Sequence, residues 1–500
     1  MERWIRLVLA PCAWAWTLVL AAGGCAVGPD YKPPQPAAPS SWYGASDRAS
    51  FASERRPDLV HWWTLFGDPT LTSLVERAVQ KNLDLQQARA RVRQARAARG
   101  AAAAGLWPTA DGTAAYTRSR AQEASVPRSA TGGTLELFQA GLDAAWELDL
   151  FGGTRRNVEA AEADLQASIE DERATLVTLV AEVGLNYMDL RRFQQEAAIA
   201  RKNLAAQRHS AELTRKRHWA GFVGALDVAN AEAQVATTEA EIPMFETSAQ
   251  QAIYRLSVLI AEEPASLMEE LSTPAPIPSD PPEIPVLVPS ELLLRRPDIR
   301  RAEAQIHAAT ARIGVATADL FPKFNLTGSA GFRGTALDEW LQWSRRVWSF
   351  GPAMDWQIFN AGRVLSAIEL QKAVQEEALL AYQKTILTAF QEVENALVAY
   401  SNERQRRQAL LEAVAANRRG VDLATRLYVQ GETDFLHVLD AQRSLYASED
   451  ALAQSERNIS ANLVALFKAL GGGWVAEQPA PAGSGETAAP EKQEASQPDP

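Results

Sequence analysis

Residues that could carry out chemistry are few in this chain of 500 residues, and they lie far apart. Zinc sites usually need closely spaced histidines or cysteines, such as a His-x-x-x-His pair on one helix face. The sequence contains no such pair, no glycine-rich phosphate loop and no Gly-x-Ser-x-Gly nucleophile motif. It therefore predicts no enzyme, no bound metal and no other cofactor. The histidines are isolated, at His61, His209, His218, His307 and His437.

The cysteines indicate a different chemistry, the attachment of lipid. Two arginines precede an apolar run at residues 7–22, which is typical of a secretory signal peptide over residues 1–24. Small residues then precede Cys25 in "LAAGGCAVGPDYKPP", which is similar to a bacterial lipobox, where the cysteine is acylated and becomes the mature N-terminus. Cys12 would leave with the signal, so we expect no disulfide in the mature chain. The alternative is an ordinary cleavage site beside an incidental cysteine.

Composition excludes one class of partner and sets two segments apart. The net charge is −11 and the basic side chains are dispersed among acids, whereas phosphate binding needs clustered lysine and arginine, so we expect no nucleic-acid partner. Residues 272–290 are rich in proline and are expected to form an extended linker. Residues 475–500 have too little apolar content to fold, which predicts a disordered tail.

A long internal repeat organises the rest of the chain. Residues 84–108 align without gaps on residues 298–322, 214 positions later, with ten of the twenty-five residues identical. We therefore expect two structural repeats, at 70–271 and 291–474, after an extended N-terminal segment at 25–69. Farther along, an offset of 210 relates Trp146 to Trp356 and Gly221 to Gly431.

Each repeat contains two stretches in which polar residues alternate with apolar or small ones. In both repeats the first stretch follows a proline, Pro108 or Pro322, which ends a helical pattern. Apolar residues on one face and polar residues on the other, over about ten residues, are typical of a transmembrane β-barrel, although one face of a soluble sandwich would look similar. The expected strands are about 109–120, 138–151, 322–334 and 346–360.

Helix length and strand number both indicate that several copies assemble. Residues 154–218 and 362–430 contain no proline, and each would span about 100 Å as a helix at 1.5 Å per residue. Four strands cannot close a barrel, and an open sheet edge is costly inside a membrane. Two copies would give eight strands, and three would give twelve, which is wide enough to begin conducting.

Several motifs in a fixed order resemble one known family. The chain is similar to the TolC-like outer-membrane factors, in particular to the lipoprotein (NodT-type) branch of RND efflux systems, and the resemblance covers nearly the whole mature chain. It is carried by "CAVGPDYKPP" at Cys25, "WWTLFGDPTLTSLVERAV" at Trp62, "LRRPDIRRAEAQI" at Leu294, "LFPKFNLTGSAG" at Leu320 and "LDAQRSLY" at Leu439.

The resemblance implies a mixed α/β membrane protein: a homotrimer whose twelve-stranded transmembrane β-barrel continues into a long periplasmic α-helical barrel. It also implies the exit duct of a tripartite pump, which passively conducts small toxic compounds and is loaded by a periplasmic adaptor and an inner-membrane RND transporter. Ala26 is not the aspartate that typically retains lipoproteins at the inner membrane, so we expect Cys25 to anchor the chain in outer-membrane lipid. A type I protein-secretion channel and a non-conducting, lipid-anchored coiled-coil spacer stay open as alternatives.

The resemblance places a periplasmic gate in "LYVQGETDFLHVLDAQRS". Gly431 interrupts a long helix there, and Asp434 is the expected N-cap of the next, with its carboxylate accepting from backbone N–H groups. Leu436 and Asp440 then share one helix face, and in the family the matched residues form constricting rings. Alternatively, Leu436 packs between helices and Asp440 is a solvated acid. Some relatives carry an arginine where this chain has Val429, so an ionic lock of that type is missing or displaced.

The companion turn, "HWAGFVGALDVANAEAQ", is the second candidate site. In the family, a groove beside these turns receives the helical hairpin of the adaptor. We therefore expect adaptor contacts at Val223, Gly224, Ala225 and the matched Gly431. The alternative is that these residues only turn the chain, because glycine favours both a tight turn and the close approach of another backbone.

Overall fold

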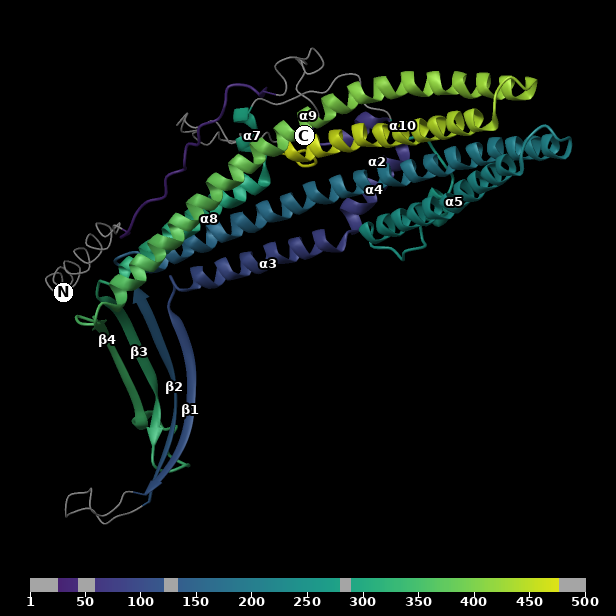
Figure 1. Ribbon diagram of the computed structural model, residues 1–500. Coiled ribbons are helices and arrows are strands. Elements are labelled where there is room, and N and C mark those ends of the chain that lie inside the picture. The colour runs from purple at the N-terminus through teal and green to yellow at the C-terminus, as the bar shows by residue number, and fades with distance from the viewer. Residues whose placement is uncertain (1–25, 44–58, 121–133, 279–288, 476–500) are drawn as a thin grey trace, which may run out of the picture.

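The computed structural model describes residues 26–43, 59–120, 134–278 and 289–475. The predicted signal peptide, Cys25 and nearly all of the predicted C-terminal tail lie outside these ranges. The described chain is mainly helical and contains a four-stranded sheet at one end of a long helical body (Figure 1). None of the described helices combines the length and the apolar character needed to cross a bilayer.

The main elements follow one order in both halves: a helix, two strands, a very long helix and a shorter helix. The first half contains α3 (Leu83–Ala104), β1 (Thr109–Arg120), β2 (Thr134–Leu148), α4 (Gly153–Trp219) and α5 (Ala225–Leu259). The second half contains α8 (Pro297–Ala318), β3 (Lys323–Gly334), β4 (Arg346–Asp355), α9 (Arg363–Gln430) and α10 (Phe435–Ala469). Shorter elements are η3 (Trp62–Phe66), α2 (Pro69–Lys81), α6 (Met268–Leu271), α7 (Pro289–Arg295) and η5 (Trp343–Arg345).

Two strands end earlier than their alternating sequence predicts. The strand expected at about 138–151 is Thr134–Leu148, because the Asp149 carboxylate accepts hydrogen bonds from the backbone N–H groups of Thr154 and Arg155 and so begins α4. The strand expected at about 346–360 ends at Asp355, and residues 356–362 form the turn into α9. β1 has the predicted bounds, and β3 begins one residue late.

The four strands form a sheet, and the helices that continue from them pack side by side in a matching order. The sheet is antiparallel in the order β1-β2-β3-β4. Near the sheet, the helices lie in the order α3-α4-α8-α9, each packed along the next (Figure 1). Because α3 runs into β1 and β4 runs into α9, one edge of the described chain carries α3 and β1, and the opposite edge carries α9 and β4.

The main hydrophobic core lies in the middle of the helical body. Tyr187 on α4 and Tyr400 on α9 are both fully buried there. Within the segment predicted to be extended, residues 25–69, the structure has a short helix, η3, at Trp62–Phe66. There, Trp62 of η3 is buried and stacks on Phe467 of α10 at 5.3 Å between ring centroids. This stacked pair packs η3, just before the first repeat, against α10.

Candidate functional site at the two helix turns

The two turns at the end far from the sheet have the same backbone geometry (Figure 1). In the α4–α5 turn, the N–H of Phe222 bonds the carbonyl of Arg217, and Gly221 has a φ of 77°. In the α9–α10 turn, the N–H of Glu432 bonds the carbonyl of Leu427, and Gly431 has a φ of 80°. This is the Schellman ending, in which a left-handed residue satisfies the last carbonyls of a helix. Glycine is required there because other residues are strained at such φ values.

The side chains that follow these turns differ. Leu436 and Asp440 are exposed on one face of α10, whereas Phe435, Val438 and Leu439 on the other face are buried in a small core at the turns. Leu436 keeps 53% of its surface exposed within the described chain. Both predicted gate residues are therefore available to something outside the chain.

Asp434 begins α10 differently from the prediction. It occupies the N-cap position with extended φ and ψ values, but its side chain accepts no capping hydrogen bond. The carboxylate is exposed instead, beside Leu436 and Asp440. The α9–α10 turn thus presents Glu432, Asp434 and Asp440 as exposed acids.

The α4–α5 turn is apolar at its surface. Trp219 and Phe222 are 89% and 73% exposed, and Leu226 follows them on α5 at 72%. Of the predicted adaptor contacts, Gly224 and Ala225 are exposed. Val223 is half-buried and packs on the small core at the turns, with its carbonyl 2.9 Å from Nδ1 of His218. Gly431, in the other turn, is exposed.

Arg217 joins the two turns, and the sequence reasoning did not identify it. Its guanidinium donates to the main-chain oxygens of Tyr428 and Val429 at the end of α9 and lies 4.7 Å from the centroid of the Tyr428 ring. The Tyr428 hydroxyl in turn donates to Oγ1 of Thr214 at 3.2 Å. Val429 supplies no charged side chain for a lock, and Arg217 reaches its carbonyl instead. A basic last turn on α4 was the available signal, but it predicts capping of α4 itself.

The pKa values of two buried carboxyl groups in the helical body are shifted in opposite directions. Burial alone would raise the pKa of Glu449 on α10, but hydrogen bonds from Arg418 and Asn203 and the charge of Lys202 hold it below its usual value. Burial raises the pKa of Glu196 on α4 to about 7, against the partly opposing charge of Arg192. Glu449 thus links α4, α9 and α10. Among the residues that the structure describes, no group of histidine, cysteine and acidic side chains could hold a metal.

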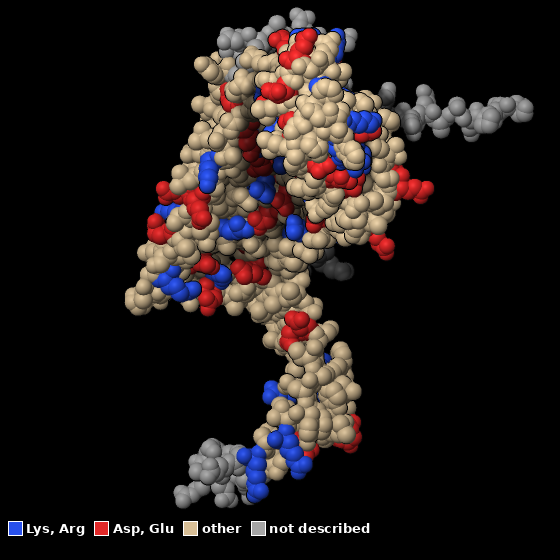
Figure 2. Space-filling view, turned by 45° about the vertical axis from the view of Figure 1, so that its right-hand side comes forward, with Lys and Arg blue, Asp and Glu red and all other residues tan. Residues whose placement is uncertain are grey.

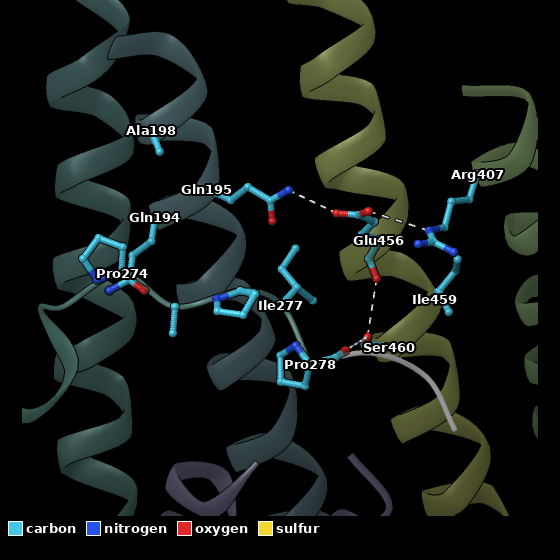
Figure 3. Close-up of a pocket in the computed structure, with 12 residues that line it drawn as sticks. Gln194, Gln195, Ala198, Pro274, Ile277, Pro278, Arg407, Glu456, Ile459 and Ser460 are labelled. Atoms are coloured by element: carbon cyan, nitrogen blue, oxygen red, sulfur yellow. Dashed lines mark hydrogen bonds and ion pairs between the residues drawn. The ribbon is translucent and has the colours of Figure 1, made fainter. Parts of the chain in front are cut away.

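The start of the proline-rich linker lies in a groove between α4 and α10 (Figure 3). Gln194 donates to the carbonyl of Leu271, and Ser460 donates to the carbonyl of Pro278. Beside the linker, Glu456 of α10 accepts from Gln195 and lies 3.7 Å from a guanidinium nitrogen of Arg407 (Figure 3). These contacts fasten the described start of the linker to the helices.

Residues just after Cys25 lie where the sheet meets the helices. The N–H of Val27 bonds the carbonyl of Phe151 at 3.0 Å, and Asp30 forms an ion pair with Arg156 at 2.6 Å. The Phe151 ring stacks on that of Phe321, with centroids 4.6 Å apart. The first described residue, Ala26, lies against Gly152, the residue that follows Phe151, at the strand–helix junction.

Charge is unevenly distributed along the sheet. In the face that Figure 2 shows, the middle of the sheet carries few charged side chains, whereas basic ones gather toward its free end. The sequence places Arg118, Arg120, Arg333 and Arg346 at the strand ends far from the helices. A mainly uncharged band thus separates this basic end from the charged helical body.

The fold and the paired turns define a class of outer-membrane channel-like proteins. Residues 74–262 and 288–472 match the model of the outer membrane efflux protein family, which is most of the chain. The chain belongs to this family.

Similar proteins match over nearly their full lengths. Nodulation protein T of Rhizobium leguminosarum bv. trifolii is 32% identical, covering 91% of this chain and 96% of that protein. The pyoverdine export outer membrane protein OpmQ of Pseudomonas aeruginosa is 34% identical, and the match covers 92% of this chain and 96% of OpmQ. The solved structure of the outer-membrane channel OprN superposes with a TM-score of 0.84 at 37% identity, covering 90% of this chain and all of that one.

Proposed function

We propose that the chain forms the outer-membrane exit duct of a tripartite efflux pump and passively conducts small compounds to the exterior. The observation that carries this proposal is that the sheet continues directly into the long packed helices. The four-stranded sheet runs directly into helices of 67 and 68 residues, which are about 100 Å long at 1.5 Å per residue. Membership of the outer membrane efflux protein family supports it. A compact globular protein has no use for helices of this length.

The open edges of the described sheet support assembly as a homotrimer. β1 and β4 each pair with one neighbour in the described chain, and unpaired backbone groups inside a bilayer cost several kcal/mol each. Three copies of four strands give a twelve-stranded barrel with a conducting interior. The helices would continue the same wall into the periplasm, where a periplasmic adaptor and an inner-membrane RND transporter would load it.

The two turns would have separate roles at the periplasmic end. Leu436 and Asp440 would form the gate with Asp434 nearby. A ring of leucines excludes water, and a ring of carboxylates sets an electrostatic barrier that depends on cations. The apolar α4–α5 turn, with Val223, Gly224, Ala225 and the matched Gly431, would contact the adaptor. Exposed Trp219 and Phe222 support this assignment, since exposed aromatic patches often mark protein interfaces.

Lipid attached to Cys25 would anchor the trimer in the outer membrane. Ala26 lies against Gly152 at the strand–helix junction where Phe151 stacks on Phe321, which supports this, because aromatic side chains favour the membrane interface. An acylated cysteine at this level could insert its chains into the adjacent leaflet.

The test is the retention of a hydrophobic cation such as ethidium by cells, together with current through the purified protein in planar bilayers. Deleting the gene should increase dye retention, and the wild-type gene on a plasmid should reverse it. Purified trimer with the gate opened by L436S/D440S should give discrete current steps. A folded trimer that gives no steps would overturn the duct and favour the coiled-coil spacer.

A further inference from the structure

The even-numbered residues of all four strands lie on one face of the sheet, which we call the even face. Successive strand residues point to opposite faces, and the register pairs even numbers with even numbers throughout, as in Tyr116 opposite Phe138. An apolar outer face is typical of a membrane barrel, so this face would contact lipid in the proposed duct. Its large exposed apolar side chains are Tyr116, Leu142, Trp146, Trp348, Phe350 and Met354.

The charged side chains of the strands are divided between the two faces. The even face of the described strands carries three arginines, Arg118, Arg120 and Arg346. Its one acid is Glu136, and all four residues lie at the strand ends far from the helices, where basic side chains gather in Figure 2. The basic end of this face therefore fits an anionic partner. The opposite face, the odd face, carries the other strand acids: Asp111, Asp143, Glu147 and Asp355.

Aromatic rings lie on the even face just before these arginines. The rings of Tyr116 and Phe138 have centroids 4.8 Å apart, and the Trp340 ring of the β3–β4 loop lies 6.4 Å from that of Phe138. The next pair on this face, farther from the helices, is Arg118 opposite Glu136. Aromatic side chains favour the boundary between hydrocarbon and water, and long basic side chains reach beyond it. The arginines would therefore lie at the level of the lipid headgroups.

A second aromatic level lies at the other end of the same face, near the helices. Trp146 follows Phe138 by eight positions on β2, and its Nε1 donates to the carbonyl of Leu106 at 3.0 Å. Eight strand residues span about 27 Å, or about 21 Å across a membrane for strands tilted by about 40°. That height is comparable to the apolar band of outer-membrane barrels, roughly 25 Å. The two aromatic levels thus fit the two interfaces of one bilayer, and only the level far from the helices carries arginines on this face.

We propose that Arg118 and Arg120 bind the phosphate groups of a lipid headgroup in the outward-facing leaflet of the outer membrane. The proposal rests on the proposed duct, in which the helices extend into the periplasm and the free end of the sheet faces outward. The two arginines are two positions apart on β1, so their Cα atoms lie about 7 Å apart on one face. Guanidinium groups bind phosphate through paired, charge-assisted hydrogen bonds. The acyl chains of the same lipid would lie along the apolar part of the even face.

The contacts of the three arginines within the chain favour Arg118 and Arg120 as the phosphate ligands. The side chain of Arg118 is 63% exposed, and its Nε lies 3.4 Å from Oε1 of Glu136. Exposed ion pairs of this kind are weak, so a lipid phosphate can compete for Arg118. Arg120 is exposed and forms no ion pair with another described residue. Arg346 is held by its own loop instead, 4.9 Å over the Trp343 ring and donating to the Trp343 carbonyl.

Native mass spectrometry of the full-length protein, purified from outer membranes in detergent, tests this site. The probe is lipid A, a glycolipid with two phosphate groups, titrated beside the same lipid after both phosphates are removed. The wild type should bind the phosphorylated form about tenfold more tightly, and R118Q/R120Q should lose about tenfold in affinity for it. R118K/R120K should lose less, because lysine keeps the charge without the paired geometry. The matched control is R333Q, at the same end of the sheet on the odd face, and it should bind as the wild type does.

E136Q should change the affinity in the opposite direction. Removing the Glu136 carboxylate leaves the Arg118 guanidinium without its partner in the chain, so binding of lipid A should tighten about threefold. A folding defect cannot produce a gain of affinity. Unchanged or weaker binding by E136Q would contradict phosphate binding at Arg118.

The outcomes separate the lipid site from the duct. Equal losses of affinity in R333Q and R118Q/R120Q, or equal binding of lipid A with and without its phosphates, would overturn the site. Displacement of lipid A by inorganic phosphate at the same concentration would also overturn it, in favour of a site for the free anion. Current steps in planar bilayers, measured on the same preparations with L436S/D440S added, report on the duct alone. Steps together with unchanged lipid affinity in R118Q/R120Q would overturn only the lipid site, and no steps in any variant would overturn the duct.

Discussion

The two helix turns at the end far from the sheet have one backbone shape and two surfaces. Gly221 and Gly431 both adopt left-handed φ values near 80°, and each closes the same pair of hydrogen bonds. Yet Trp219, Phe222 and Leu226 make one turn apolar, whereas Glu432, Asp434 and Asp440 make the other acidic. An internal repeat can therefore preserve a scaffold while its exposed residues take on separate roles. The four predictions below test whether shape and surface are separable in this way.

The largest effect is expected from removing Tyr428, which only the α9–α10 turn possesses. Tyr428 is almost fully buried beside Phe435, and the matched residue in the other turn is the exposed His218. Y428A should destabilise the turns by about 3 kcal/mol, as is typical for losing a buried aromatic ring. H218A should destabilise the turns much less. Hydrogen exchange of the turn amides in the folded protein measures both, and equal effects would contradict the asymmetry.

A smaller effect is expected at Arg217, which connects the two turns. R217M keeps much of the side-chain length but loses the charged hydrogen bonds to the carbonyls of Tyr428 and Val429. We expect a loss of about 2 kcal/mol in the stability of the turns, since bonds to a charged group contribute about that much. K216M, on the neighbouring exposed residue, is the matched control. Faster exchange at both turns in R217M alone would indicate that they move as one unit.

A still smaller and symmetrical effect is expected from the glycines. G221A and G431A should each cost about 1 kcal/mol, because an L residue is strained at these φ values. Thermal unfolding should shift equally in the two variants. A clearly larger loss of stability in one variant would show that the two turn backbones are not equivalent, which would contradict a shared scaffold.

Sequence reasoning succeeded where the pattern is local and failed where a contact joins distant segments. Alternation after Pro108 predicts β1, and paired glycines predict both turns, because these signals lie within the elements themselves. The early end of β2 was missed because Asp149 bonds the first turn of the following helix, which alternation does not encode. The burial of Trp62 against Phe467 was missed for a similar reason, since their packing depends on the assembled helices.

The candidate site shows the same division. The spacing of Leu436 and Asp440 predicts that they share one helix face, the structure adds that both are exposed, and their role as a gate stays a prediction. Arg217 could not be found from periodicity, because its partners are more than two hundred residues away and are backbone carbonyls. Backbone acceptors leave no signature in the sequence of the partner segment.

The most direct test of the account is single-channel conductance with matched substitutions in the two turns. L436S/D440S changes the predicted gate, and L226S/N230S changes the residues at the same positions of the α4–α5 turn, 210 positions earlier. We predict low conductance for the wild-type trimer, a several-fold rise for L436S/D440S and no change for L226S/N230S. An equal rise in both variants, or a rise only in L226S/N230S, would contradict a gate at the α9–α10 turn.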